Sequence, residues 1–416
     1  MKILLVGGTW SPELNKDEKT YGQPSRLVQS VHNSLRDKHE VATYNGGNYT
    51  QLEDILNSAS QYDVVFWWPN VVDNTLPKIR DVKAVAPKVM LVTSKRNDNN
   101  KYDFMQLAQH ALGVKANMAF EFSKTDEKKF KIKVFDPLGC VWYEGYDMGV
   151  AVDKAMERIQ FLRTMSRQPT LHSTITKEDV FKAVMGKDYE LCKSDRTVDI
   201  PQEQQFINIV RKHAETFYQI FNPGKDVKRF LGNASMRPDI HSTRCMRGMP
   251  SFKADGYIFM SQRNVDKQFI DIDHFVPCYM EDGKIYYCGD NKPSVDTPIQ
   301  MRLYQELPHI KYIIHSHCYI DDSCIASVHT TSKPVPCGAI EEVDEIMEAV
   351  KRTDEEFNAV LEYWMKAHGK EKPEGQRAPV YRINLKGHGS IVMSESLDGL
   401  ENVQYISRNL PEIMYR

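Results

Sequence analysis

Two histidines separated by one serine are the residues of this sequence whose spacing first suggests chemistry. The stretch "YIIHSHCYID" (312–321) runs from three apolar residues into His315, Ser316 and His317. Alternate residues of a strand point to the same face, so the two imidazoles can converge on one point. That is the spacing two metal ligands need, although two ordinary histidines near a strand end would look the same. A metal site also requires a third protein ligand from elsewhere in the chain.

His388 supplies a candidate for that third ligand. It lies between two glycines in "LKGHGSIV" (385–392), which predicts a strand followed by a turn. Glycines on both sides let the backbone approach its neighbours closely. The alternative is a turn histidine without a chemical role.

The elements around these histidines predict an α+β domain over residues 200–416. An amphipathic helix (203–221) comes first, and "EDGK" (281–284) is a hairpin turn signal between two strands. A helix near 298–307 precedes the strand that carries His315, and a strand pair carries His388. These short strands and turns favour a largely antiparallel sheet.

Residues 1–168 have a different pattern, in which apolar strands alternate with helical stretches. The strands are "KILLVGG", "HEVATYN", "YDVVFWWPN" and "KVMLVTSKRN", with amphipathic segments between them. Such a rhythm predicts a doubly wound parallel sheet, flavodoxin-like or Rossmann-like, with helices on both faces. The Ser/Thr/Pro-containing segment 169–199 is predicted to be a connector.

Parallel sheets bind ligands beyond the carboxyl ends of their strands, next to helix N-termini. Here those ends carry a possible ligand loop with glycines, hydroxyls and a cation, namely Gly7, Gly8, Thr9, Ser94 and Lys95. A nucleotide, a flavin or a sugar phosphate would suit them. However, "GGTWSP" matches neither the dinucleotide-binding nor the P-loop motif, so a scaffold domain is the alternative.

Composition excludes several classes of function. The formal net charge is −2, so no strong field favours nucleic acid, and the basic stretch 124–133 is interrupted by acids, as in a solvated hairpin or strand edge. No apolar run approaches the length of a membrane span, and no signal peptide is visible. Eight cysteines without a CxxC pair are typical of free thiols in a reducing compartment. A cytoplasmic protein is expected.

Residues 200–416 resemble the class II aldolase/adducin family, which includes fuculose-phosphate aldolase and ribulose-phosphate 4-epimerase. Four blocks in the family's order carry the resemblance: "LGNASMRP" (231–238), the segment 292–317, "KPVPCGAI" (333–340) and "LKGHGSIVMSESLDGL" (385–400). Each block is short, but their order and spacing together are specific. The resemblance covers the second half and none of the first.

The resemblance implies a metal site and an acid/base residue. His315, His317 and His388 would bind Zn²⁺ or Mn²⁺, leaving coordination positions for a substrate carbonyl. The product of deprotonation or C–C cleavage beside that carbonyl would be a metal-stabilised enediolate. Asp296 stands where the aldolases carry glutamate and the epimerases aspartate, so it would move a proton or bind the metal. Capping the following helix is its alternative role.

The resemblance also implies a phosphate site made of Gly232, Asn233 and Ser294, with backbone and neutral donors. Val295 replaces a second serine, and the segment after His317 is shorter than in the family. The family's further acid/base residue has no clear counterpart; Asp321, Asp322, Glu341 and Glu342 are candidates, each also suited to a surface or capping role. Tyr405 or Tyr415 matches, by position only, a tyrosine that the family contributes across a subunit interface.

The predicted function is therefore a divalent-metal-dependent aldolase acting on a small phosphorylated sugar or hydroxy-ketone. A sugar-phosphate 4-epimerase, or a dehydratase or decarboxylase of the same family, is the first alternative. A non-catalytic adducin-like binding protein and a bifunctional fusion with a nucleotide- or flavin-binding first domain are the others. Members of the family are commonly tetramers, so the resemblance implies a homo-oligomer, expected to be a tetramer. Nucleic-acid and membrane partners are not expected.

Overall fold

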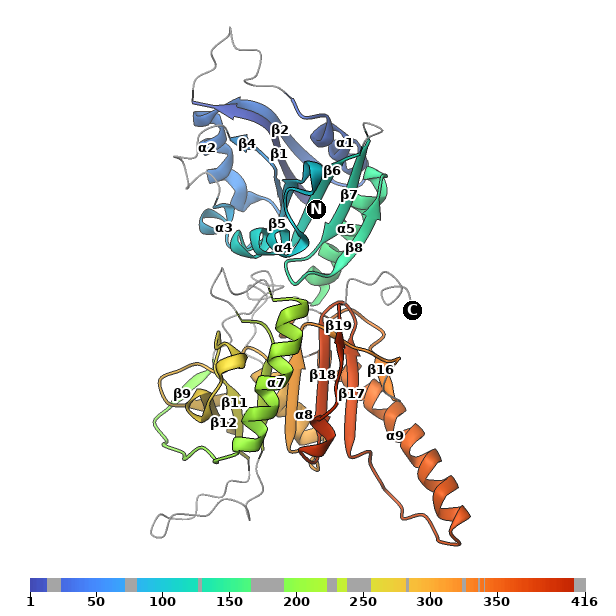
Figure 1. The fold of residues 1–416 in the computed structure, drawn as a ribbon. Helices are drawn as coiled ribbons and strands as arrows, with labels where there is room; N and C mark the ends of the chain where they lie inside the picture. Colours follow the sequence, from blue (N-terminus) through green and yellow to red (C-terminus); the bar gives the residue numbers. More distant parts are fainter. Residues whose placement is uncertain are drawn as a thin grey trace. The chain divides into compact units, whose positions relative to one another are not determined.

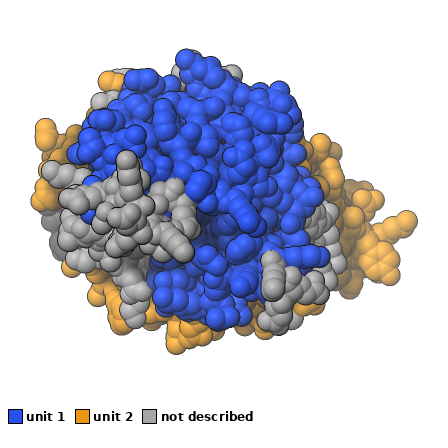
Figure 2. Space-filling model, turned by 90° about the horizontal axis from the view of Figure 1, so that it is seen from above, with its two compact units in different colours: residues 1–168, 176–185 blue, residues 169–175, 186–416 orange. Residues whose placement is uncertain are grey.

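The chain divides into two compact units. The computed structural model describes residues 1–12, 24–71, 81–125, 129–165, 191–222, 230–237, 256–281, 284–323, 327–335, 337–339 and 341–407. Unit 1 comprises residues 1–168 and 176–185, and unit 2 comprises residues 169–175 and 186–416 (Figure 2). Each unit is described by itself below.

Within the described residues, unit 1 has an eight-stranded sheet in the order β2-β1-β3-β5-β6-β7-β8, with β4 paired to β1 beside that path. Its strands are β1 (Lys2–Ser11), β2 (Glu40–Asn48), β3 (Val64–Trp67), β4 (Asn70–Val71), β5 (Met90–Arg96), β6 (Met118–Lys124), β7 (Phe130–Phe135) and β8 (Val141–Gly145). Pairing is parallel from β2 through β6 and antiparallel for β7 and β8. The order of the parallel strands is flavodoxin-like.

Helices cover both faces of this sheet (Figure 1). They are α1 (Arg26–Leu35), α2 (Tyr49–Ser58), α3 (Val82–Val85), α4 (Phe104–Gly113) and α5 (Met148–Met165). Leu52 of α2 and Leu107 of α4 share one core with Leu4 and Val65 of the sheet. On the other face α1 lies against β1 and packs beside α5. The doubly wound prediction is confirmed, and the antiparallel edge adds β8 in a segment for which no strand was predicted.

The described part of unit 2 forms a nine-stranded sheet in the order β16-β17-β18-β14-β10-β11-β12-β13-β9. Its strands are β9 (Cys192–Ser194), β10 (Asn233–Met236), β11 (Ile258–Ser261), β12 (Phe275–Glu281), β13 (Lys284–Cys288), β14 (Tyr312–Ser316), β16 (Val328–Thr330), β17 (Val380–Leu385) and β18 (Gly389–Ser394). Only the edge pairs β13–β9 and β16–β17 are parallel. The largely antiparallel sheet is as predicted, and β9 lies within the segment 169–199 that was expected to be a connector.

Among the described residues of unit 2, three helices flank the sheet, namely α7 (Gln204–Ile220), α8 (Thr297–Glu306) and α9 (Glu342–Ala367). Phe206 of α7 packs against Tyr312 of β14, with ring centroids 5.0 Å apart and the ring planes tilted by 39°. The next residue, Ile313, points to the opposite face and shares a core with buried residues of α8 and α9. His315 has the same parity as Ile313, so the sheet directs its side chain towards the α8 face.

Shorter elements complete the two units. A two-stranded sheet joins β15 (Tyr319–Ile320) to β19 (Tyr405–Ile406). Single 3₁₀ turns are η1 (Ala59–Gln61), η3 (Asp98–Asn100), η4 (Lys267–Phe269), η5 (Ile272–His274) and η6 (Asp398–Leu400). None of the helices in the described parts of the chain is long and apolar enough to cross a membrane.

Candidate metal centre

His315 lies near the end of β14, in the middle of the sheet of unit 2. It pairs with Asn233 of β10 on one side and with Ile391 of β18 on the other. His317 follows one residue beyond the end of the strand. A central strand with partners on both sides holds its backbone firmly, so the direction of the His315 side chain is fixed by the sheet.

His388 reaches the same place from the turn between β17 and β18. Its backbone N–H donates to the carbonyl of Leu385, and Gly387 has a φ of +69°. A Cβ on Gly389 would lie 2.0 Å from the carbonyl oxygen of Ser316. Only glycine permits that close approach, which brings the turn against β14 and places His388 beside His315.

The three histidines form a buried cluster. Each offers one ring nitrogen, and these atoms all lie within 4.8 Å of one another. The ring centroids are 4.7 to 5.0 Å apart, and each histidine is at most 5% exposed. Three imidazoles at this separation match the ligand set of an open divalent-metal site.

Hydrogen bonds behind two of the rings orient them. Nδ1 of His315 donates to the carbonyl of Ser390 at 2.9 Å, so Nε2 carries the lone pair; that buried nitrogen has no hydrogen bond within the described residues. Nδ1 of His388 contacts Oε1 of Glu342 at 2.6 Å. A buried lone pair and a carboxylate behind a ligand histidine are both features of metal sites, so the residues present fit a divalent cation.

Burial sets the protonation states in this cluster. It lowers the pKa of His315 to about 4, and the nearby His388 adds to that shift. The imidazole is therefore neutral near pH 7, which is the form that binds metals. Burial raises the pKa of Glu342 well above its usual range, against the opposing effect of His315. A cation at the histidines would favour the ionised carboxylate.

Asp296 faces the histidine cluster instead of capping its helix. It occupies the N-cap position of α8, but its side chain makes no capping hydrogen bond. Its Oδ2 lies 3.9 Å from Nε2 of His315 and accepts a hydrogen bond of 2.5 Å from Nδ2 of Asn233. The capping alternative is wrong, because the carboxylate points to the cluster and is 5% exposed.

The residues predicted to hold a phosphate lie beside Asp296, but their side chains are already engaged. Asn233 contacts Asp296 through Nδ2 and accepts a hydrogen bond from Gln300 at Oδ1. Gly232 has a φ of +74°, and a Cβ there would lie 2.7 Å from the carbonyl of His315. Ser294 is buried, and its Oγ accepts from the backbone of Asp296. These contacts position Asp296; the phosphate role stays a prediction.

Gln300 and Cys337 are residues whose place near the site was not predicted. Gln300 is four residues after Asp296, so one helical turn puts both on the same side of α8, a spacing the sequence does contain. Sγ of Cys337, in the block "KPVPCGAI", lies 3.9 Å from Oδ1 of Asp296. Nothing local to Cys337 signals that contact.

The four acids that were candidates for a further acid/base residue differ in burial and in their contacts. Glu342, the first residue of α9, is buried and holds His388, whereas Glu341 is only partly buried at the helix start. Asp321 accepts hydrogen bonds from Ser323 in a local turn, and Asp322 is exposed. Glu342 is thus neither a surface acid nor a cap.

Of the two tyrosine candidates, Tyr405 is buried and its hydroxyl lies 2.7 Å from Nδ1 of His213. This contact joins Tyr405 to α7 within unit 2, because His213 belongs to that helix. Tyr415 lies outside the described residues.

The predicted ligand loop of unit 1 lies at a separate pocket. Gly8, Thr9, Ser94 and Lys95 line that pocket, whereas Gly7 is not among its lining residues. A Cβ on Gly7 would lie 2.1 Å from Cγ2 of Val28, so this glycine serves the contact of β1 with α1.

An α+β unit with three convergent histidines and a buried aspartate defines a candidate metal-dependent domain. Residues 214–399 match the family model for the Class II Aldolase and Adducin N-terminal domain. Over those residues the chain is similar to the class II aldolase and adducin family. No curated protein sequence matches the chain.

Three solved structures show distant similarity to this chain. L-fuculose 1-phosphate aldolase is 14% identical, with 48% of this chain and 80% of that chain covered and a TM-score of 0.29. YgbL from Klebsiella pneumoniae, described as a putative aldolase/epimerase/decarboxylase, is 14% identical, with 52% and 99% covered and a TM-score of 0.27. The DNA/pantothenate metabolism flavoprotein from Streptococcus pneumoniae is 11% identical, with 39% and 98% covered and a TM-score of 0.31. These values are too low to transfer chemistry.

Proposed function

We propose that unit 2 is a divalent-metal-dependent lyase that cleaves a C–C bond in a small phosphorylated sugar or hydroxy-ketone. The observation that carries the proposal is the buried convergence of His315, His317 and His388 beside Asp296. A buried set of three imidazoles has no packing advantage over apolar side chains, because burial of polar groups costs free energy unless they are satisfied. A bound cation would give a partner to Nε2 of His315, which has no hydrogen bond within the described residues.

His315, His317 and His388 would hold the cation, with Zn²⁺ as the first choice and Mn²⁺ as the second. When bound, such an ion acts as a Lewis acid that offsets negative charge on a substrate oxygen. Ser390 and Glu342 keep two of the rings in the orientation that turns Nε2 to the site. The donor set of neutral imidazoles leaves the cation its positive charge for the substrate.

Asp296 would accept the proton of the substrate hydroxyl as the C–C bond breaks and the aldehyde forms. It would then return that proton to the carbon of the ketone fragment. Its Oδ2 is held by Asn233, and Oδ1 is the oxygen left to face the substrate, next to Cys337. Gln300 holds Asn233 in turn, so a hydrogen-bonded chain from α8 positions the carboxylate. General acid/base catalysis of this kind contributes about 10²- to 10⁴-fold in rate.

Epimerisation is the second candidate, and the identity of residue 296 favours it. Aspartate is one methylene shorter than glutamate, and the sequence resemblance places aspartate in the epimerases. Cleavage and re-formation of the same C–C bond would change the configuration at one carbon. The two candidates share the metal site and differ in the fate of the aldehyde fragment.

Metal analysis of the purified chain tests the proposal. We expect one divalent ion per wild-type chain and a loss of it in His315→Ala and His388→Ala. The exposed His368, at the end of α9, provides a matched control, and His368→Ala is expected to keep its metal. A wild-type chain that binds no stoichiometric divalent ion would refute the proposal that unit 2 is a metal-dependent lyase.

Turnover with a panel of pentulose and hexulose phosphates then separates the two candidates, because cleavage releases an aldehyde and epimerisation does not. Asp296→Asn keeps the shape of the side chain and removes its proton-carrying function. This variant is expected to retain the ion and lose at least about 10²-fold in kcat. Wild-type turnover by Asp296→Asn would rule out the acid/base role.

A further inference from the structure

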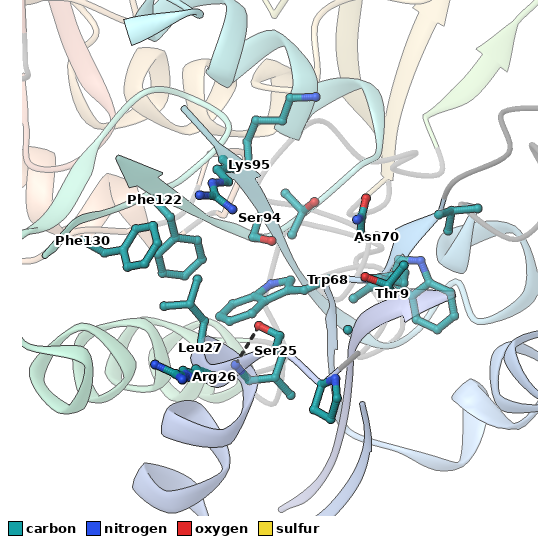
Figure 3. Close-up of a pocket in the computed structure, with 18 of the residues that line it drawn as sticks. Thr9, Ser25, Arg26, Leu27, Trp68, Asn70, Ser94, Lys95, Phe122 and Phe130 are labelled. Atoms are coloured by element: carbon teal, nitrogen blue, oxygen red, sulfur yellow. Dashed lines mark hydrogen bonds between the residues drawn. The ribbon is translucent and has the colours of Figure 1, made fainter. Parts of the chain in front are cut away.

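Unit 1 contains a pocket that the proposed function does not use. It has a volume of about 840 Å³ and lies at the carboxyl ends of β1, β3 and β5, next to the start of α1 (Figure 3). That volume is within the range of sites for small molecules and cofactors. The position is the one at which open parallel sheets bind ligands, because helix N-termini and strand ends converge there.

Trp68 provides a flat apolar surface in this pocket. Its ring packs against Phe120 and Phe122, with centroids 5.1 and 5.4 Å away, and these contacts hold the indole in place. Trp68 and Phe122 both line the pocket, so part of this aromatic surface faces the cavity. A held indole surface is suited to stacking against a planar heterocycle, since little side-chain entropy remains to be lost.

The start of α1 provides donors for an anion. Ser25 is the N-cap, and its Oγ accepts from the backbone N–H of Val28 at 3.5 Å. Arg26 and Leu27 follow in the first turn and line the pocket, and first-turn N–H groups have no partner within their helix. The helix dipole and the Arg26 guanidinium both favour a negative charge there.

Neutral donors lie between the aromatic surface and the helix start. Figure 3 shows Ser25 and Ser94 around the indole of Trp68, with Thr9 beyond it. Trp67 also lines the pocket, is 7% exposed, and its Nε1 has no hydrogen bond within the described residues. A buried indole N–H on a pocket wall, with no acceptor among the described residues, points to a ligand acceptor.

The two cations at the end of β5, Lys95 and Arg96, line the pocket but are held by other contacts. Nε of Arg96 donates to Oδ2 of Asp98 at 2.6 Å, and Nζ of Lys95 lies 4.8 Å from the ring centre of Tyr102. In Figure 3 Lys95 extends away from Trp68. Arg26 is therefore the cation best placed for an anion at the helix start, and Lys95 would contribute mainly long-range attraction.

We infer that this pocket binds a planar heterocycle that carries one phosphomonoester, which is the chemistry shared by flavin mononucleotide and nucleoside monophosphates. The ring stacks on Trp68, the phosphate lies at the N-terminus of α1 with Arg26, and Trp67, Thr9 and Ser94 bind polar groups between them. One helix start serves one phosphate, which agrees with the lack of a dinucleotide motif in "GGTWSP". This inference concerns unit 1 and does not depend on the proposed function.

Calorimetric titration of the full chain with five probes tests the inference: flavin mononucleotide, AMP, riboflavin, adenosine and inorganic phosphate. We expect one of the two phosphorylated probes to bind with 1:1 stoichiometry and at least about 10-fold more tightly than its unphosphorylated partner and than phosphate alone. The probe that binds identifies the source of the ring. Equal affinity with and without the phosphate, or no binding at millimolar concentration, overturns the inference.

Variants on one helix locate the phosphate. Arg26→Ala is expected to weaken binding about 10-fold, whereas Arg36→Ala, exposed at the other end of α1, leaves it unchanged. Trp68→Leu is expected to weaken binding of the phosphorylated probe and to leave weak phosphate binding intact; a thermal melt of each variant confirms that it is folded. Unchanged affinity in Arg26→Ala would refute the assigned phosphate site. His315→Ala is expected to bind the probe as wild type does, because His315 belongs to unit 2. A failure of the proposed metal site can therefore be distinguished from a failure of the pocket in unit 1.

Discussion

Glu342 is the residue whose role changes most between sequence and structure. It was one of four acids weighed as a general acid/base, and it contacts Nδ1 of His388 at 2.6 Å on the side away from the cluster. A carboxylate in this position fixes the tautomer of the histidine and raises the basicity of its other nitrogen. Glu342 is therefore a positioning residue for His388, one of the three proposed metal ligands.

Substitution of Glu342 tests that role. Glu342→Gln is expected to lower the affinity for the divalent ion about 10- to 100-fold, because the amide holds His388 less firmly and carries no charge. Competition with a chelator of known affinity measures the change. Glu348→Gln, on the exposed side of the same helix, is the control and should bind like wild type. Equal affinities in both variants would contradict the positioning role.

The buried residue His213 leads to a prediction about how the stability of the folded chain depends on pH. Its Nε2 donates to the carbonyl of Leu400, and Nδ1 accepts from the hydroxyl of Tyr405, so the ring is neutral in the folded chain. Burial lowers its pKa to about 4. The unfolded state binds a proton near pH 6.5 and the folded state does not, so protons favour unfolding between these two values.

The contribution of His213 to the free energy of unfolding should therefore be complete above about pH 6.5 and be lost as the pH falls from about 6.5 to about 4. The loss from this residue is expected to reach up to about 3 kcal/mol. Denaturant unfolding at pH 7 and pH 5, in the presence of a chelator at both, measures the effect. His213→Gln should be less stable at pH 7 but show a smaller pH dependence. An unchanged pH dependence in that variant would exclude His213 as a source.

At the scale of elements, α8 is the part that positions the site, and Arg237 secures its far end. The Arg237 guanidinium donates to the carbonyl of Tyr304 in the last turn of α8 and to those of Leu307, Pro308 and Ile310 in the segment that follows the helix. The last carbonyls of a helix have no partner within it, so such a donor supports the helix end. Asp296 and Gln300 lie at the other end of the same helix. The segment "GNASMR" (232–237), which contains β10, thus carries both Asn233 at the candidate site and Arg237 at the far end of α8.

Loss of this support should cost stability. Arg237→Ala is expected to lower the free energy of unfolding by about 2 to 4 kcal/mol, because several buried carbonyls lose a charged donor together. Arg237→Lys should recover only part, since a single ammonium cannot reach all four acceptors. The control is Arg302→Ala on the same helix, whose ion pair with Asp344 is at the surface and is worth at most about 1 kcal/mol. Equal effects at 237 and 302 would contradict the argument.

At the scale of the whole molecule, two units with separate cores and separate sites make up the chain. Calorimetric unfolding is therefore expected to show more than one transition. Removal of the divalent ion by a chelator should lower the midpoint of one transition and leave the other in place, because ligand binding stabilises only the fold that contains its site. His315→Ala should melt like the chelated wild type with or without chelator. A chelator shift that persists in His315→Ala would place the ion elsewhere.

The sequence predicted both sheets for a simple physical reason. Apolar runs with helical stretches between them favour buried parallel strands, and short strands with turn residues favour an antiparallel sheet, so local patterns carry most of that information. The alternation of residues in β14 also predicted that His315 could serve a site, and the glycines around His388 predicted a close approach.

Other features were not accessible from local patterns. Residue 296 precedes a helix, and sequence reasoning kept a cap as the alternative to a catalytic group. Only the contacts with Asn233 and His315 show that its carboxylate faces the histidines and does not cap α8. Glu342 is 46 residues from His388 in the chain, and no local spacing relates them.

The residue types, the order of the blocks and the sheet class of each half were determined by the sequence itself, because propensity and periodicity act over a few neighbouring residues. The tertiary structure alone decided which acid faces the histidines, which acid orients one of them, and that Trp67, Trp68 and the start of α1 enclose one pocket. Those outcomes depend on strands and helices far apart in the chain meeting at sheet edges and turns, where packing sets the position of each side chain.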